Sequence, residues 1–234
     1  MTIDEMSLLL QKRGLHLSSM QKEQFVKYMN LLIEWNEKIN LTAIKNPSEI
    51  IEKHFYDSLL LIDVIQLDSQ KLIDIGSGAG LPGIPLKIAF PNLKVTLLEP
   101  TGKRVTFLNT VIRELKLCDI VALNDRAENI KHDQREFFDV AVARAVAPLN
   151  ILNELSLPFI KVNGLFIAMK GPSADEEAVL ASNSVIKLSS HIQSIFSTNL
   201  VTNNDVRKMV IIKKDEPISL KYPRLFAEIK KKPL

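Results

Sequence analysis

The stretch Lys71–Ile88, which reads KLIDIGSGAGLPGIPLKI, constrains the fold more than any other part of this sequence. An apolar run that ends in Asp74 meets a cluster of glycines, and a second apolar run follows. Glycine adopts backbone conformations that other residues avoid and lets a ligand lie against the main chain, while the start of a helix presents unpaired N–H groups. Pro82 and Pro85 suit such a start, because a proline in the first turn loses no helical hydrogen bond. The stretch therefore predicts a strand, a tight loop and a helix.

The spacing of the glycines favours one class of ligand without deciding it. A dinucleotide-binding loop has the pattern G-x-G-x-x-G, which from Gly76 requires glycine at position 81, where this chain has Leu81. Gly76, Gly78 and Gly80 instead follow G-x-G-x-G, the form found in loops that cradle S-adenosylmethionine (SAM). A nucleotide or dinucleotide loop and a plain tight turn stay open as alternatives, since glycine-rich strand-to-helix turns also occur without a ligand.

Apolar runs of strand and helix length alternate from Lys71 onward. We expect strands at 71–75, 94–99, 119–124, 138–143, 164–169, about 191–197 and 207–213, and helices at about 83–89, 103–116, 148–160 and 174–187. This alternation predicts an α/β fold with a mostly parallel sheet, helices on both faces, and a ligand at the carboxyl ends of the strands.

The first 65 residues have helical periodicity and a single glycine, Gly14. Ser18 or Ser19 can cap the second helix, with Gln21 at capping-box distance from Ser18. A stripe of apolar side chains then recurs at helical spacing and is expected in the core: Phe25, Tyr28, Met29, Leu32 and Trp35. We therefore expect residues 1–65 to form a helical cap on a domain of residues 66–234.

Composition excludes several classes of protein. The 234 residues are enough to bury a full core, and no apolar run reaches the length of a membrane span. Met1 to Leu10 contains Asp4 and Glu5 where a signal peptide would be basic, so we expect a cytoplasmic protein. Cys118 is the only cysteine, which rules out an internal disulfide; we expect no metal site and a buried Cys118.

Charge is concentrated at the C-terminal end. The net charge is +3, but from Arg207 onward nine Lys and Arg residues stand against three Asp and Glu, which leaves the rest of the chain at −3. A basic end on a near-neutral body suits a phosphate-facing surface, and a solvated tail is an equally good interpretation.

Polar residues follow three of the predicted strands. Glu99 ends the second strand, 23 positions after Gly76, where a carboxylate can accept hydrogen bonds from both ribose hydroxyls of a nucleoside. After the third strand, Glu128 can bind an adenine edge while Ala127 leaves room for the ring. Arg144 ends the fourth strand, next to the expected position of a methyl donor, and a buried arginine without a function is uncommon.

The chain resembles the RsmG family, also called GidB: bacterial methyltransferases that act on guanine N7 in small-subunit (16S) ribosomal RNA. The motifs that carry the resemblance come in the family's order over nearly the whole length: WNEKINLTAI, KHFYDSLLL, LIDIGSGAGLPGIPL, LLEPTGKRVTFL, DRAE, VARAVAPL, KG at Lys170–Gly171 and YPR at Tyr222–Arg224. LPGIPL is the most specific of them. Two features depart from the family: Pro100 follows Glu99, and Leu225-Phe226-Ala227-Glu228 stands where a basic, glycine-containing segment is usual.

The resemblance implies a seven-stranded SAM-dependent methyltransferase fold (Rossmann-like) with an N-terminal helical cap. It also implies S-adenosylmethionine as cofactor and 16S rRNA or the small ribosomal subunit as partner, without a membrane; we expect a monomer. The implied SAM contacts are Gly76, Ser77, Gly78, Gly80, Leu81, Glu99, Ala127, Glu128 and Arg144.

Guanine N7 has a lone pair and no proton, so its methylation requires no general base, and the enzyme's task is to align the reactants. Candidates for guanine recognition are Arg144, Asn40, His54 and Lys170. A SAM-dependent methyltransferase of another substrate and a non-catalytic RNA-binding protein that retains the SAM site are the alternative functions.

Overall fold

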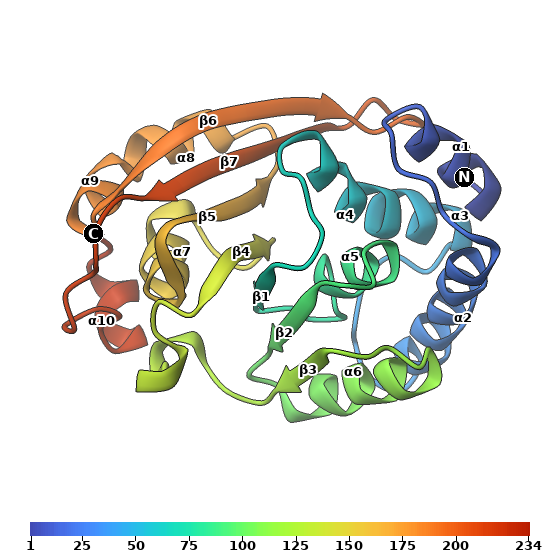
Figure 1. The fold of residues 1–234 in the computed structure, drawn as a ribbon, viewed down its shortest axis with the longest axis horizontal. Coiled ribbons are helices and arrows are strands. Elements are labelled where there is room, and N and C mark those ends of the chain that lie inside the picture. Colours follow the sequence, from blue (N-terminus) through green and yellow to red (C-terminus); the bar gives the residue numbers. More distant parts are fainter.

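The computed structural model describes residues 1–234 and contains one seven-stranded sheet with the order β3-β2-β1-β4-β5-β7-β6 (Figure 1). The five strands β1 to β5 are parallel, and β7 runs antiparallel to both β5 and β6. The strands span β1 Lys71–Ile75, β2 Lys94–Leu98, β3 Ile120–Leu123, β4 Phe138–Arg144, β5 Ile160–Lys170, β6 Ser190–Asn199 and β7 Val206–Lys214. The predicted α/β fold with a mostly parallel sheet is therefore confirmed.

The order of the strands determines where a ligand can bind. Strand β1 lies between β2 and β4, so the chain order reverses at β1. In open α/β sheets, ligands bind at the carboxyl ends of the strands next to such a reversal. The glycine loop follows β1 and Arg144 ends β4, so both lie at this edge of the sheet.

Two of the four helices expected after residue 66 match their ranges closely, at Gly83–Ala89 and Gly102–Glu114. The helices are α1 Ile3–Gln11, α2 Ser19–Asn36, α3 Pro47–Ile50, α4 Asp57–Leu59, α5 Gly83–Ala89, α6 Gly102–Glu114, α7 Leu149–Ser156, α8 Ala174–Leu180, α9 Ser182–Lys187 and α10 Phe226–Lys231. The helix expected over 148–160 ends earlier, because Pro158 has no N–H for an α-helical bond and lies in a 3₁₀ turn at Leu157–Phe159. The helix expected over 174–187 is divided into α8 and α9 at Ala181.

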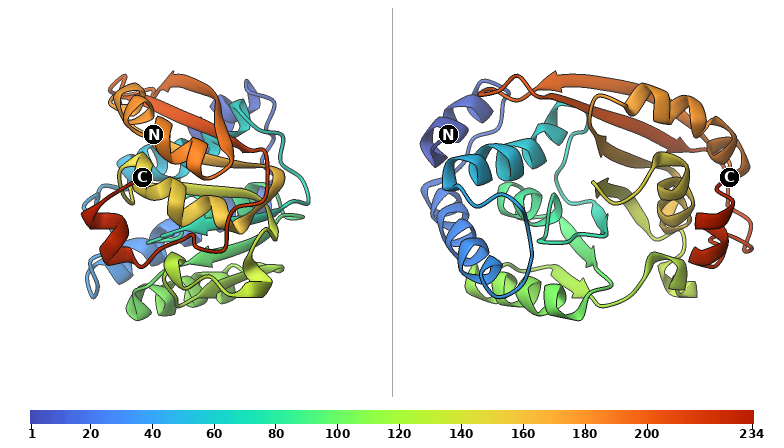
Figure 2. Two further views of the ribbon diagram at one scale, coloured as in Figure 1. Left: turned by 90° about the vertical axis from the view of Figure 1, so that its left-hand side faces the viewer. Right: turned by 180° about the vertical axis from the view of Figure 1, so that it is seen from behind.

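The two faces of the sheet carry separate hydrophobic cores, because side chains alternate along each strand. Leu72 and Val140 point into a core formed with α1, α2, α4, α5 and α6, whereas Ile73 and Ala141 point into a core formed with α7 to α10. Figures 1 and 2 show these two groups of helices on opposite sides of the sheet. The N-terminal helices thus share a core with the sheet, and the division at residue 65 stays a prediction.

Helix α2 begins as predicted. Ser18 accepts a hydrogen bond from the Gln21 N–H and the Gln21 side chain accepts one from the Ser18 N–H, a complete capping box. Of the apolar stripe, Phe25, Tyr28 and Leu32 are fully buried, whereas Met29 and Trp35 are half-buried.

Cys118 is exposed, so its expected burial is wrong. It lies between Lys116 and Asp119, both of which have positive φ, in the turn that connects α6 to β3. In this turn Leu115 and Leu117 contact the core, whereas Cys118 and Asp119 face solvent. None of the helices combines the length and the apolar composition needed to cross a bilayer.

Candidate active site

The loop after β1 has the conformation that its glycines predict. Gly76, Gly78 and Gly80 have φ values of +69°, +58° and +91°, in the region that side chains other than glycine rarely adopt. The Gly76 and Ser77 N–H groups donate to the Leu98 carbonyl at 2.8 and 3.1 Å, which fastens the loop to the end of β2. The loop then enters α5 at Gly83, where a Cβ would collide with Leu97 at 2.4 Å.

Glu99 holds the glycine loop from the side. Its carboxylate is only 2% exposed and accepts the Gly78 N–H at 2.9 Å on Oε2 and the Thr101 N–H at 2.9 Å on Oε1. The Arg104 guanidinium lies 3.8 Å from Oε1. Each carboxylate oxygen has two acceptor sites, so both oxygens can still accept a ribose hydroxyl.

Two buried polar atoms of this region lack a partner: Ser77 Oγ and Asp74 Oδ1. The other oxygen of Asp74 accepts the Gly83 N–H at 2.8 Å, and burial raises the pKa of Asp74 to about 7. A Cβ added at Gly78 would meet no atom closer than 3.9 Å, so open space lies beside the main chain there. A nucleoside ligand fits this region, because there is open space beside Gly78 and the Glu99 carboxylate could accept ribose hydroxyls. The unpaired oxygens of Ser77 and Asp74 suit a ligand that also carries a polar chain, as SAM does.

A cavity of about 130 Å³ continues from the loop along the ends of β1, β2 and β3. Its walls are mostly apolar, and Asp125, Ala127 and Glu128 lie at its polar side. The Glu128 carboxylate lies 3.7 Å from the Arg126 guanidinium. The predicted adenine residues Ala127 and Glu128 are thus brought together with Gly76, whereas Leu81 is buried and does not line this cavity.

Val146 and Phe226 also line this cavity, and neither was among the predicted residues. Val146 belongs to the VARAVAPL motif, two positions after Arg144, and could have been inferred from that motif. Phe226 lies 150 positions after Gly76, and no local pattern relates it to the glycine loop.

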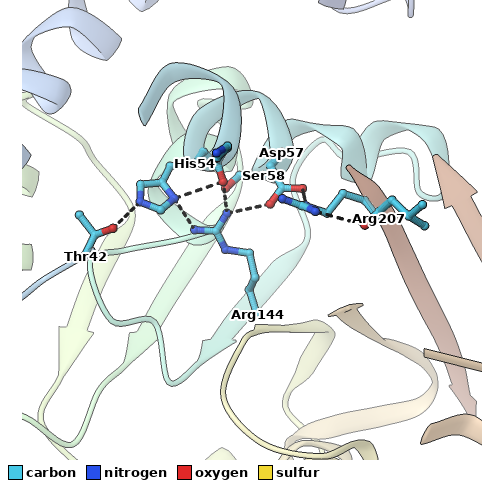
Figure 3. A network of polar contacts seen from close by, with 8 residues as sticks. Thr42, His54, Asp57, Ser58, Arg144 and Arg207 are labelled. Carbon is cyan, nitrogen blue, oxygen red and sulfur yellow. Dashed lines mark hydrogen bonds and ion pairs between the residues drawn. The ribbon is translucent and has the colours of Figure 1, made fainter. Parts of the chain in front are cut away.

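A second cavity, of about 310 Å³, lies beyond the end of β4 and is lined by His54 and by five charged side chains: Lys53, Asp57, Arg144, Lys170 and Arg207. Asp57 lies between two guanidinium groups, with Oδ2 at 3.0 Å from Arg144 Nη1 and Oδ1 at 3.1 Å from Arg207 Nε (Figure 3). Burial raises the pKa of Asp57, and the two arginines oppose that shift. No local pattern in the sequence could select Arg207 as a site residue, because its partner Asp57 is 150 positions away.

Arg144 is held in one orientation by three acceptors. Besides Asp57, Nη1 donates to the Lys53 carbonyl at 3.1 Å, and Nη2 lies 3.4 Å from His54 Nδ1. A guanidinium has five N–H groups, so two remain for a ligand. Its side chain is 14% exposed, which leaves it accessible from the cavity.

His54 orients Arg144 and is itself positioned by Thr42, whose Oγ1 lies 2.8 Å from His54 Nε2. Burial and the nearby Arg144 charge lower the pKa of His54 to about 4, so the ring is neutral at pH 7. His54 lies in a π-helical segment, Ile51–Tyr56, between α3 and α4. Single π turns are frequent at functional sites because they redirect side chains relative to a regular helix.

The remaining two predicted guanine-binding residues differ in position. Lys170 lines the charged cavity, but its ammonium donates to the Ala147 carbonyl at 2.6 Å and to Glu177 at 2.7 Å. Asn40 is exposed and lines neither cavity. In the same motif, Asn36 accepts the Leu41 and Thr42 N–H groups and so shapes the turn that carries Thr42.

The basic C-terminal end is partly neutralised within the chain. Arg207 pairs with Asp57, Lys208 with Asp175, Lys214 with Glu136, and Arg224 with Glu154. Lys230, Lys231 and Lys232 are exposed. No group of three or more His, Cys, Asp or Glu side chains is arranged to hold a metal ion.

Comparison with known proteins identifies related sequences over nearly the full length. The family model described as rRNA small subunit methyltransferase G (GidB) matches residues 21–206. Proteins named ribosomal RNA small subunit methyltransferase G are similar to this chain in Thermoanaerobacter sp. strain X514 (46% identity, 94% of this chain and 93% of the relative) and in Clostridium botulinum strain Loch Maree (47%, 90% of each). The relative in Streptococcus thermophilus strain CNRZ 1066 is 44% identical over the whole of both chains.

Solved structures share the fold at low sequence identity. The M. jannaschii protein TYW2 in complex with AdoMet superimposes with a TM-score of 0.58 at 13% identity, covering 76% of this chain and 80% of TYW2. A 16S rRNA (adenine(1408)-N(1))-methyltransferase mutant from Catenulisporales acidiphilia has a TM-score of 0.54 at 14% identity, covering 65% and 88% of the two chains. These similarities support the fold of a SAM-dependent methyltransferase.

Proposed function

The chain belongs to the rRNA small subunit methyltransferase G (GidB) family, and from this premise we propose that it transfers a methyl group from SAM to N7 of a guanine in 16S rRNA. The observation that carries the proposal is the adjacency of two sites at one edge of the sheet. The glycine loop and the mostly apolar cavity beside it follow β1 to β3, and the charged cavity begins at Arg144, where β4 ends.

The chemistry demands little acid or base from the protein. SAM supplies a methyl group on a cationic sulfur, and guanine N7 accepts it with a lone pair that carries no proton. The neutral His54 agrees with this requirement, because a ring held by Thr42 and Arg144 orients its neighbours and need not take up a proton. Catalysis then rests on alignment of the reactants within the site.

We assign Arg144 to positioning. A cation against N7 would oppose the development of positive charge on the methylated base, so the two free N–H groups of Arg144 are better used at guanine O6 or at the SAM carboxylate. Asp57 fixes the guanidinium and is shared with Arg207. Glu99 binds the ribose hydroxyls, and Ala127 and Glu128 bind the adenine. The guanine must leave its stack to reach the charged cavity.

Cytoplasmic localisation and a monomeric state complete the proposal. The small ribosomal subunit is a cytoplasmic substrate. The exposed lysines at 230–232 provide the phosphate-facing charge, since four other basic groups near the C-terminus are paired with carboxylates.

The proposed function is tested by incubation of the purified protein with labelled SAM and with 30S subunits, naked rRNA or small metabolites, followed by mapping of the label. We expect label on N7 of one guanine of 16S rRNA. Label in a metabolite would identify a different substrate, and SAM and RNA binding without transfer would identify a non-catalytic protein.

The role of Arg144 is tested by single-turnover transfer at saturating SAM and RNA. Arg144→Lys retains the charge but loses the planar fork that contacts three acceptors, so it should be nearly as slow as Arg144→Ala. Arg113→Ala, a change at an exposed arginine of α6, is the matched control and should transfer normally. Near-normal transfer by Arg144→Lys would show that a point charge suffices.

A further inference from the structure

We propose that Phe226, in the C-terminal helix α10, forms one wall of the adenine site and contributes directly to cofactor affinity. This inference rests on the proposed function, since it concerns the same cofactor. Phe226 lines the cavity of about 130 Å³ together with Gly76, Pro100, Ala127 and Val146. It belongs to the segment Leu225–Glu228, the part of the sequence that departs from the family's usual pattern and has no other assigned role.

A buried ion pair fixes the segment that carries Phe226. Glu154 of α7 is fully buried and accepts the Arg224 N–H at 2.9 Å and Arg224 Nε at 2.8 Å on one oxygen, and Arg224 Nη2 at 2.7 Å on the other. Such forked pairing defines both position and orientation. Leu155, the residue after Glu154, lines the same cavity as Phe226, so the ion pair fastens α10 next to the cavity.

Two further contacts close the segment onto the protein. Ile229, on the face of α10 that meets the core, is fully buried. Arg224 Nη2 also donates to the Lys232 carbonyl at 3.1 Å, which ties the end of α10 to its beginning. In Figure 1, α10 lies beside α7. Two contacts therefore fix the position of Phe226: the pairing of Arg224 with Glu154 before it in the sequence, and the burial of Ile229 after it.

The chemistry of the cavity matches a purine. Ile75, Leu98, Pro100, Val146, Leu155 and Phe226 give it apolar walls, and the carboxylates of Asp125 and Glu128 lie among its polar groups. The faces of an adenine ring are apolar and its edge carries an amino group that donates hydrogen bonds. Aromatic side chains in contact with bases contribute about 1–3 kcal/mol when measured by alanine substitution. Loss of Phe226 should consequently weaken binding of an adenine ligand about tenfold.

The test is calorimetric titration of SAM, S-adenosylhomocysteine and adenosine into the wild type, Phe226→Ala, Phe226→Leu and Leu225→Ala. We expect Phe226→Ala to lose about tenfold in affinity for all three ligands, since they share the adenosine group. Phe226→Leu should lose less, because it keeps an apolar wall. Leu225→Ala is the matched control: Leu225 is 69% exposed and does not line the cavity, so its variant should bind as the wild type does.

Several outcomes would overturn the inference. Equal or tighter SAM binding by folded Phe226→Ala would show that the ring is outside the site or obstructs it. Weaker binding of SAM but unchanged binding of adenosine would place the ring away from the base. If Phe226→Ala does not fold, the same comparison with Phe226→Leu decides. A wild-type protein that binds none of the ligands would refute the proposed function itself, whereas loss confined to the variants supports both.

Discussion

Asp74 should make the protein less stable as the pH rises from 5 to 8. Its carboxyl group is fully buried between the glycine loop and α5, one oxygen has no partner, and burial raises its pKa to about 7. The Arg144 charge opposes this rise, and Glu99 adds to it. The unfolded chain should release the same proton near pH ~3.9.

The sign and size follow from proton linkage. Between the two pKa values the folded protein holds one proton more than the unfolded protein, so the free energy of unfolding falls by about 1.4 kcal/mol per pH unit. The contribution of Asp74 is therefore most favourable below the unfolded pKa and is lost as the pH rises toward 7. From pH 5 to pH 8, Asp74 should cost the wild type about 2–3 kcal/mol.

The perturbation is Asp74→Asn, which keeps an acceptor for the Gly83 N–H and cannot ionise. Urea unfolding of both proteins at pH 5, 6, 7 and 8, without cofactor, gives the difference in unfolding free energy. That difference should move by about 2 kcal/mol in favour of the variant as the pH rises. Any change in unfolding free energy caused by the amide itself is the same at every pH. The pKa of His54 is lowered to about 4, which makes the unfolding free energy rise with pH, but both proteins share this contribution and it cancels in their difference.

Asp133→Asn makes the same chemical change at an exposed position and is the matched control. Parallel stability curves for the wild type and Asp74→Asn would refute the reasoning. They would mean that Asp74 remains ionised when buried.

The other predictions concern cofactor and RNA. Gly78→Val places a branched side chain at φ +58°, toward the open space beside the loop, and should cost at least ~2 kcal/mol of SAM binding in calorimetry; undiminished affinity in a folded variant would remove the loop from the site. Glu99→Gln replaces one of the two carboxylate oxygens, which accept the Gly78 and Thr101 N–H groups, by an amide nitrogen, so SAM affinity should fall about tenfold or more. Loss of folding without an effect on affinity would make Glu99 structural. Substitution of the three lysines at 230–232 by Gln should leave SAM affinity unchanged and flatten the salt dependence of RNA binding by up to ~0.7–0.9 log unit per lost phosphate contact; an unaltered slope would leave these lysines without a phosphate contact.

The sequence by itself determined most of the elements and the conformation of the glycine loop. Strand β1, the glycine loop and α5 occur where the pattern KLIDIGSGAGLPGIPLKI predicts them, because each depends on residues next to one another in the chain. The capping box of Ser18 and Gln21 and the mostly parallel sheet are likewise local signals or consequences of strand–helix alternation. Glu99 could be selected because it follows β2 directly.

Only the tertiary structure decided which distant side chains share a site. Asp57, the first residue of α4, and Arg207, at the start of β7, are 150 positions apart and meet only in the folded chain. Phe226 reaches the cavity beside Gly76 because a buried ion pair, Arg224 with Glu154, fastens the C-terminal segment to α7. Pairings of this kind depend on how helices pack on the sheet, and local periodicity carries no information about them.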